Sequence, residues 1–131
     1  MAGARSPGRP LSPHLQVWRW HVTMAGSILH RATGMALYAG AAGLVIWLIA
    51  AASGPEVYTP IALLLSTWFG QLALYLLVGC FAYHLANGVR HLVFDTGRGL
   101  NPGDADTSAW FAILFGIAAP IGLFLLLSFG R

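Results

Sequence analysis

Five polar or ionisable side chains stand out because they lie within or beside long apolar segments of this 131-residue chain. Ser27, His30 and Arg31 belong to one segment, and His84 and His91 belong to another. Ionisable residues inside apolar segments are costly, so they are candidates for a functional site by default. An imidazole can ligate a metal, and a guanidinium can donate hydrogen bonds to carboxylate or carbonyl oxygens. The two groups therefore indicate a metal site, a site for such an oxygen ligand, or both.

His84 lies deepest, about two turns inside the last apolar residue of its segment. A neutral imidazole there could ligate the iron of a b-type haem while its other nitrogen bonds to a carbonyl. Gly88, one turn away, would let a flat macrocycle approach the backbone. A histidine that hydrogen-bonds between packed membrane helices fits the same residues equally well, so both interpretations stay open at this point.

Spacing limits how these histidines can be used. His84 and His91 are separated by about 10 Å along one helix face, so one iron cannot bind both. We expect His30 and Arg31 at the level of His91, roughly 10 Å shallower than His84, where they would suit haem propionates or a second ligand. If iron at His84 is six-coordinate, its second axial ligand must come from another chain.

Ser27, His30 and Arg31 share one arc of their predicted helix. The guanidinium of Arg31 suits a carboxylate or carbonyl oxygen, and Ser27, one turn away, can bond the same ligand. The alternative is that Arg31 only reaches toward lipid phosphates and that Ser27 merely packs.

The composition indicates which elements position these residues. Hydrophobic residues make up 57% of the chain and charged residues only 8%, against roughly a quarter charged in a soluble domain. The chain is therefore expected to be an integral membrane protein. Its few arginines form no basic cluster, which excludes a nucleic-acid partner. The single cysteine, Cys80, excludes a disulfide framework or a cysteine metal cage.

The apolar segments predict an all-α fold with three transmembrane helices at about 23–52, 60–94 and 108–129, within a membrane domain at 23–131. Thr59 as N-cap and Pro60 at the first position would begin the second helix. Residues 1–22 would form an N-terminal arm. Because the arm and the second loop carry most of the arginines, the positive-inside rule places both on the cytoplasmic or matrix side.

The arrangement of these residues resembles a known family. The segments occur in the order and at the spacing of two signatures of the cytochrome b subunit of succinate dehydrogenase, or respiratory complex II. They are Arg9-Pro10-Leu11, Leu15, Ser27-Ile28-Leu29-His30-Arg31-Ala32-Thr33, His84, Gly88-Val89-Arg90-His91 and Phe94-Asp95-Thr96-Gly97.

The resemblance implies that the chain is half of a two-subunit helical bundle, paired with a second hydrophobic anchor subunit. The pair would share one haem b, with His84 as an axial ligand and His30, Arg31 and His91 near the propionates. Ser27 and Arg31 match the family's ubiquinone-site positions, and no departure occurs there. The iron–sulfur subunit and the flavoprotein subunit would dock on the cytoplasmic or matrix face.

Two other functions remain compatible with the sequence. The chain could be the anchor of a quinol:fumarate reductase, which runs the reaction in reverse with a low-potential quinone. It could also be a haem-free structural or assembly subunit. A bacterial inner membrane is favoured because the arm lacks an Arg/Ser-rich amphipathic transit helix, and the mitochondrial inner membrane is the alternative.

Overall fold

The computed structural model describes residues 19–130, so most of the predicted arm lies outside the described residues. Within this range the chain forms four α-helices and no strand. Their bounds are α1 Val22–Ser53, α2 Pro55–Ser66, α3 Trp68–Asp95 and α4 Pro102–Phe129. Three of them, α1, α3 and α4, are long and apolar enough to cross a membrane. The prediction of an all-α chain with three spanning helices is confirmed.

The first spanning helix, α1, has 32 residues and is therefore about 48 Å long. His21 precedes it in an extended conformation, and the His21 ring accepts a hydrogen bond from the backbone N–H of Thr23. The helix ends at Ser53, and the following Gly54 has a φ of 104°, which is open to glycine and strained for other residues. The chain then turns directly into α2.

The second predicted helix, at about 60–94, is in fact two helices with a break at Thr67. Thr67 has an extended backbone, and its hydroxyl accepts a hydrogen bond from the N–H of Gly70 at 3.1 Å, which caps α3. The short helix α2 begins at Pro55, so Pro60 lies inside it and not at its first position. The expected start at Pro60 was wrong because Pro55 already satisfies the same preference.

The last helix, α4, begins earlier than the predicted start near Ser108. Asn101 stands at the N-cap position, Pro102 begins the helix, and Asp104 lies in its first turn. A proline at the first position and an acidic residue near the positive end of the helix dipole both favour this start.

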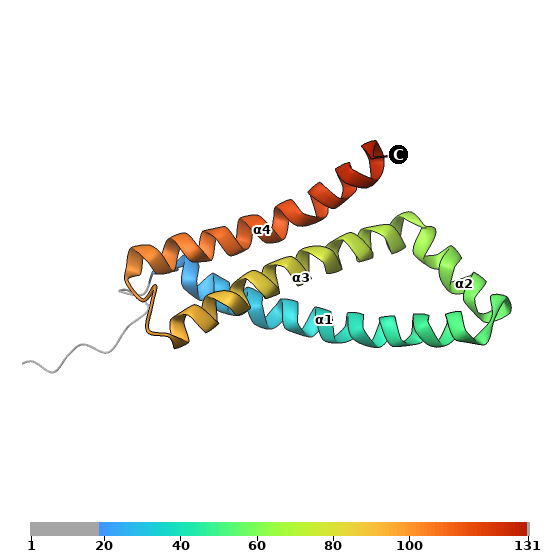
Figure 1. Ribbon diagram of the computed structural model, residues 1–131, viewed down its shortest axis with the longest axis horizontal. Coiled ribbons are helices and arrows are strands. Elements are labelled where there is room, and N and C mark those ends of the chain that lie inside the picture. The colour runs from blue at the N-terminus through green and yellow to red at the C-terminus, as the bar shows by residue number, and fades with distance from the viewer. Residues whose placement is uncertain (1–18, 131) are drawn as a thin grey trace, which may run out of the picture.

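Figure 1 shows the three long helices converging at one end, which contains the start of α1 and the connection between α3 and α4. His21 Nε2 lies 3.4 Å from Asp106 Oδ1 and joins α1 to α4 at this end. The helices diverge toward the opposite end, where α2 bridges α1 and α3. The long helices are therefore close together at the end that carries the histidines and spread apart, like a fan, toward the other end.

The interior of this fan is small. The buried hydrophobic residues of the described chain are four alanines, Ala50, Ala82, Ala109 and Ala112, together with Tyr83. Long apolar side chains cover the outside along all four helices. Because small residues allow membrane helices to approach closely, α3 and α4 meet through them, and the larger apolar side chains are left to lipid or to neighbouring proteins.

Candidate functional site

A cluster of three histidines lies where α1 crosses α3. The rings of His30 and His84 are stacked, with centroids 3.9 Å apart and planes inclined by 12°. The His91 ring lies 5.4 Å from that of His30 and is tilted by 52°. His30 and His84 are half-buried, whereas His91 is exposed. His30 thus contacts both α3 histidines, and the cluster joins the two polar groups that the sequence places far apart.

This contact corrects one expectation about depth. The sequence predicts His30 about 10 Å shallower than His84, but the two rings are in contact. That prediction was wrong because it measured each residue from the apolar boundary of its own segment. Packing between the two helices sets their register, and a single sequence does not define it.

The Nδ1 atom of His84 lies 3.2 Å from the hydroxyl of Thr33 on α1. That hydroxyl lies 2.8 Å from the carbonyl oxygen of Leu29 and 3.1 Å from that of His30. The Nε2 atom of His84 makes no hydrogen bond with any residue in the range 19–130. One nitrogen of the ring is therefore held by α1, and the other is left without a partner from this part of the chain.

Glycine explains how the two helices come so close at this point. A Cβ atom on Gly34 would lie 3.1 Å from Cε1 of His84, which is tighter than an ordinary contact. The absence of a side chain at Gly34 therefore lets the imidazole rest against α1. Gly88, by contrast, borders open space, because a Cβ atom there would meet nothing within 4 Å.

His30 has a polar atom that the described residues leave unsatisfied. Its Nε2 is buried and has no hydrogen-bond partner within residues 19–130. A buried polar atom without a partner is costly and calls for an explanation such as a missing ligand or neighbour. This nitrogen is therefore available to a group from outside the chain.

Arg31 and Ser27 form the second part of the site, one turn apart on α1. Nη2 of Arg31 lies 3.4 Å from the Ser27 hydroxyl, and both side chains are exposed. The predicted pairing of these two residues on one helix face is thus present. Because neither side chain is covered by α3 or α4, both can bind a ligand held between this chain and a neighbour.

Tyr83 fixes the part of α1 that carries this pair. Its hydroxyl donates a 2.7 Å hydrogen bond to the carbonyl oxygen of Gly26, and the residue is only 5% exposed. A side chain on Gly26 would begin 3.6 Å from that hydroxyl, an ordinary contact. The bond anchors the residue before Ser27 to α3.

The remaining polar residues of this region tie α3 to α4. The Arg90 guanidinium donates hydrogen bonds to the Ser108 hydroxyl at 2.9 Å and to the Ala105 carbonyl at 3.1 Å, and it lies over the ring of Phe94. The side chain of Asn87, 1% exposed, bridges from Arg90 to His91. Arg90 therefore has a structural role, and it orients Asn87 beside the histidine cluster.

Comparison with known proteins identifies the chain. The family model described as the succinate dehydrogenase/fumarate reductase transmembrane subunit matches residues 5–123. The chain belongs to this family. Its relatives include the succinate dehydrogenase cytochrome b556 subunit of Paracoccus denitrificans, 38% identical over 109 residues that cover 83% of this chain and 84% of the relative. The mitochondrial cytochrome b560 subunit of Homo sapiens is 34% identical over 117 residues, covering 88% and 69%.

These matches confirm the family inferred from the sequence motifs. A further relative, the cytochrome b556 subunit of Rickettsia prowazekii, is 34% identical over 109 residues that cover 83% of this chain and 85% of the relative. The family match at residues 5–123 includes both the α1 and the α3 parts of the histidine cluster. The chain is accordingly a multi-pass membrane-anchor subunit of the succinate dehydrogenase type.

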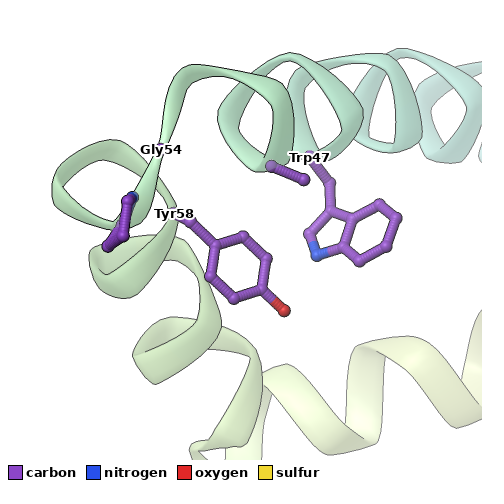
Figure 2. Close-up of a pocket in the computed structure, with 5 residues that line it drawn as sticks. Trp47, Gly54 and Tyr58 are labelled. Carbon is purple, nitrogen blue, oxygen red and sulfur yellow. The ribbon is translucent and has the colours of Figure 1, made fainter.

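One cavity lies at the other end of this anchor subunit, away from the histidines. Its volume is about 430 Å³, and it is lined by Trp47 and Ala51 of α1 with Gly54, Pro55 and Tyr58. Figure 2 shows the rings of Trp47 and Tyr58 facing this hollow beside the turn between α1 and α2. These lining residues include neither a histidine nor an arginine, so the cavity differs chemically from the histidine cluster.

Two residues of the cluster received no role from the sequence. Thr33 entered only as part of the matching motif, and Gly34 was assigned no role. A small residue can be matched with a histidine on another helix only when the register between the two helices is known. Without that register, neither the Thr33 hydrogen bond nor the Gly34 contact could be found.

Proposed function

We propose that this chain and a second hydrophobic anchor subunit together bind one haem b and one ubiquinone in a succinate:quinone oxidoreductase. The observation that carries the proposal is the histidine cluster, with Thr33 bonded to His84, beside the exposed pair Ser27 and Arg31. Within residues 19–130, Nε2 of His84 has no hydrogen-bond partner, and the buried Nε2 of His30 has none either. Both features fit a site that is completed from outside the chain.

In this proposal His84 would hold the haem iron. Its Nδ1 is already hydrogen-bonded to Thr33, so Nε2 is the nitrogen available to iron. The open face beside Gly88 has room for a flat macrocycle. When bound there, the haem would supply a one-electron redox centre whose potential depends on its ligands and surroundings.

His30, Arg31 and His91 would interact with the carboxylates of the haem propionates. His30 contributes the unpartnered Nε2, and Arg31 contributes a guanidinium that suits a carboxylate. Because the His30 ring stacks face to face on the His84 ring, it does not aim a nitrogen at the same iron. This geometry favours a role for His30 beside the haem and not as a second ligand.

Ser27 and Arg31 would bind the ubiquinone headgroup. A quinone carbonyl oxygen gains negative charge as electrons arrive, and hydrogen-bond donors placed at that oxygen stabilise the charge. The Arg31 guanidinium and the Ser27 hydroxyl lie 3.4 Å apart and face outward from α1. They can therefore act on one oxygen without rearrangement of the helix.

The proposed partners are those that the remaining chemistry requires, and the proposed orientation is supported by the arginines. Succinate oxidation needs a flavin, and electron relay needs iron–sulfur clusters, so a flavoprotein subunit and an iron–sulfur subunit must supply both. We propose that they dock at the histidine-bearing end, on the cytoplasmic side of a bacterial inner membrane. The arginines of the arm and of the α3–α4 connection favour that orientation. The matrix side of a mitochondrial inner membrane is the equivalent alternative.

Spectroscopy of the purified complex tests this proposal. His84→Leu should abolish or strongly alter the b-type absorption band that appears on reduction with dithionite. His21→Leu makes the same change in a histidine outside the cluster and should keep the band. If the wild-type complex has no b-type band, the chain is a haem-free structural subunit, the alternative from another functional class.

A second candidate is an anchor of a quinol:fumarate reductase, which the family description also includes. The two candidates differ in the direction of electron flow and in the quinone. Extraction of the native quinone, with a redox titration of the haem, separates them. A menaquinone and a low haem potential would favour the fumarate-reducing enzyme.

A further inference from the structure

The hydroxyl of Thr33 is the only polar group of α1 that bonds the His84 ring among residues 19–130. It has a single proton and three neighbours within hydrogen-bond distance. Two are the backbone carbonyl oxygens of Leu29 at 2.8 Å and His30 at 3.1 Å, and the third is His84 Nδ1 at 3.2 Å. A carbonyl oxygen can only accept a hydrogen bond, whereas an imidazole nitrogen can donate or accept.

Counting protons distinguishes the two tautomers of His84. With the ring proton on Nδ1, the Thr33 hydroxyl donates to the Leu29 carbonyl and accepts from Nδ1–H, so both protons are used. With the ring proton on Nε2, Thr33 must donate to Nδ1 instead. The Thr33 hydroxyl oxygen and the Leu29 carbonyl oxygen would then lie 2.8 Å apart with no proton between them. In addition, Nε2–H of His84 would have no acceptor within the described range.

We propose that Thr33 is a positioning residue that holds His84 as the Nδ1–H tautomer, which leaves Nε2 unprotonated and ready to ligate iron. The proposal rests on the proposed role of His84 as a haem ligand. Thr33 acts through His84 and does not itself contact the haem.

The hydrogen bond between Thr33 and His84 has two effects on the His84 ring. It sets the ring orientation before the haem binds, since the hydroxyl is fixed to the α1 backbone and the ring is confined by His30 and Gly34. It also strengthens donation from the imidazole, because a hydrogen bond accepted from the second ring nitrogen raises ligand basicity. Stronger donation favours ferric over ferrous iron and lowers the midpoint potential.

The test compares variants of the complete, membrane-extracted complex. Thr33→Val keeps the shape of the side chain and removes the hydroxyl, and Thr33→Ser keeps the hydroxyl. Thr107→Val is the matched control, because the Thr107 hydroxyl makes the same type of bond to a carbonyl one turn back on α4, also at 2.8 Å, and bonds no histidine within residues 19–130. Haem potential is measured by optical redox titration, and ring orientation by the g values of the ferric EPR signal.

We expect Thr33→Val to shift the midpoint potential to a more positive value and to change the ferric g values. Thr33→Ser and Thr107→Val should match the wild type in both measurements. Unchanged potential and g values in Thr33→Val would overturn the proposal, and so would equal shifts in Thr33→Ser.

If Thr33→Val does not assemble, Thr33→Ala is compared with Thr33→Ser in the same way. Failure of both hydroxyl-free variants while Thr33→Ser assembles would give the hydroxyl a packing role only and would overturn the proposal. The role of His84 is judged separately. Retention of the b-type band in His84→Leu refutes the proposed function, whereas loss of that band with an unchanged Thr33→Val refutes only the inference about Thr33.

Discussion

Replacing Arg31 or Ser27 by alanine removes hydrogen-bond donors that face outward from α1 near the histidine cluster. We expect each change to slow ubiquinone reduction by at least about tenfold, because donors that stabilise developing charge contribute strongly to rate. Succinate oxidation with an artificial soluble acceptor should be unchanged. Both rates are measured on the same purified complex.

Ser53→Ala provides the control for Ser27→Ala, since Ser53 is an exposed serine at the opposite end of α1. It should leave both rates unchanged. Equal loss of the two activities in Arg31→Ala would point to failed assembly and would contradict a role in binding the quinone.

Tyr83→Phe removes the 2.7 Å hydrogen bond between α3 and the Gly26 carbonyl and leaves the ring in place. We expect a loss of about 0.5–1 kcal/mol in stability, since hydrogen bonds between membrane helices contribute modestly. Titration with a denaturing detergent measures this change. Tyr75→Phe is the control, because Tyr75 contacts Phe124 through its ring and its hydroxyl has no hydrogen bond within residues 19–130. Equal effects of the two changes would contradict the anchoring role of Tyr83.

At the scale of elements, the contact between α3 and α4 depends on Gly116. A Cβ atom there would lie 2.7 Å from Cβ of Tyr83, so the helices must move apart. We expect Gly116→Ala to cost about 1–3 kcal/mol, as for other overpacked interiors. A Cβ atom on Gly122, on the same helix, meets nothing within 4 Å among residues 19–130, so Gly122→Ala should be nearly neutral. Detergent unfolding of both variants measures the difference, and a neutral Gly116→Ala would show that this contact is loose.

The spanning helices could be predicted because an apolar segment of about 20 residues or more is typical of a membrane-spanning helix. Their ends were harder to predict. The break at Thr67 has no proline or glycine at the break itself, and it depends on a hydroxyl cap that competes with continuation of the helix. The early start of α4 did have a signal, in Asn101 followed by Pro102 and by Asp104.

The types of residue in the candidate site could also be predicted, but their contacts could not. The pairing of Arg31 with Ser27 follows from helix periodicity alone. The stacking of His30 on His84 depends on the register between α1 and α3, which is set where Gly34 admits the His84 ring and where Leu77 packs against Gly40. Helix periodicity contains no information about that register.

At the scale of the whole molecule, orientation in the membrane is open to a direct test. Single cysteines are introduced by Arg98→Cys in the α3–α4 connection and by Glu56→Cys in the first turn of α2, in a Cys80→Ser background. An impermeant thiol reagent should label Arg98→Cys only from the cytoplasmic side and Glu56→Cys only from the opposite side. Labelling from the reverse sides would overturn the proposed orientation.

The bond between Thr33 and His84 joins residues 51 positions apart in the chain. At a synthesis rate of about 5–20 residues per second, Thr33 leaves the ribosome roughly 3–10 seconds before His84 does. During that interval Arg31, His30 and Ser27 face the bilayer without α3. We therefore expect α1 to remain beside the insertion machinery until α3 arrives, so that biogenesis of this subunit includes a waiting step between its first and later helices.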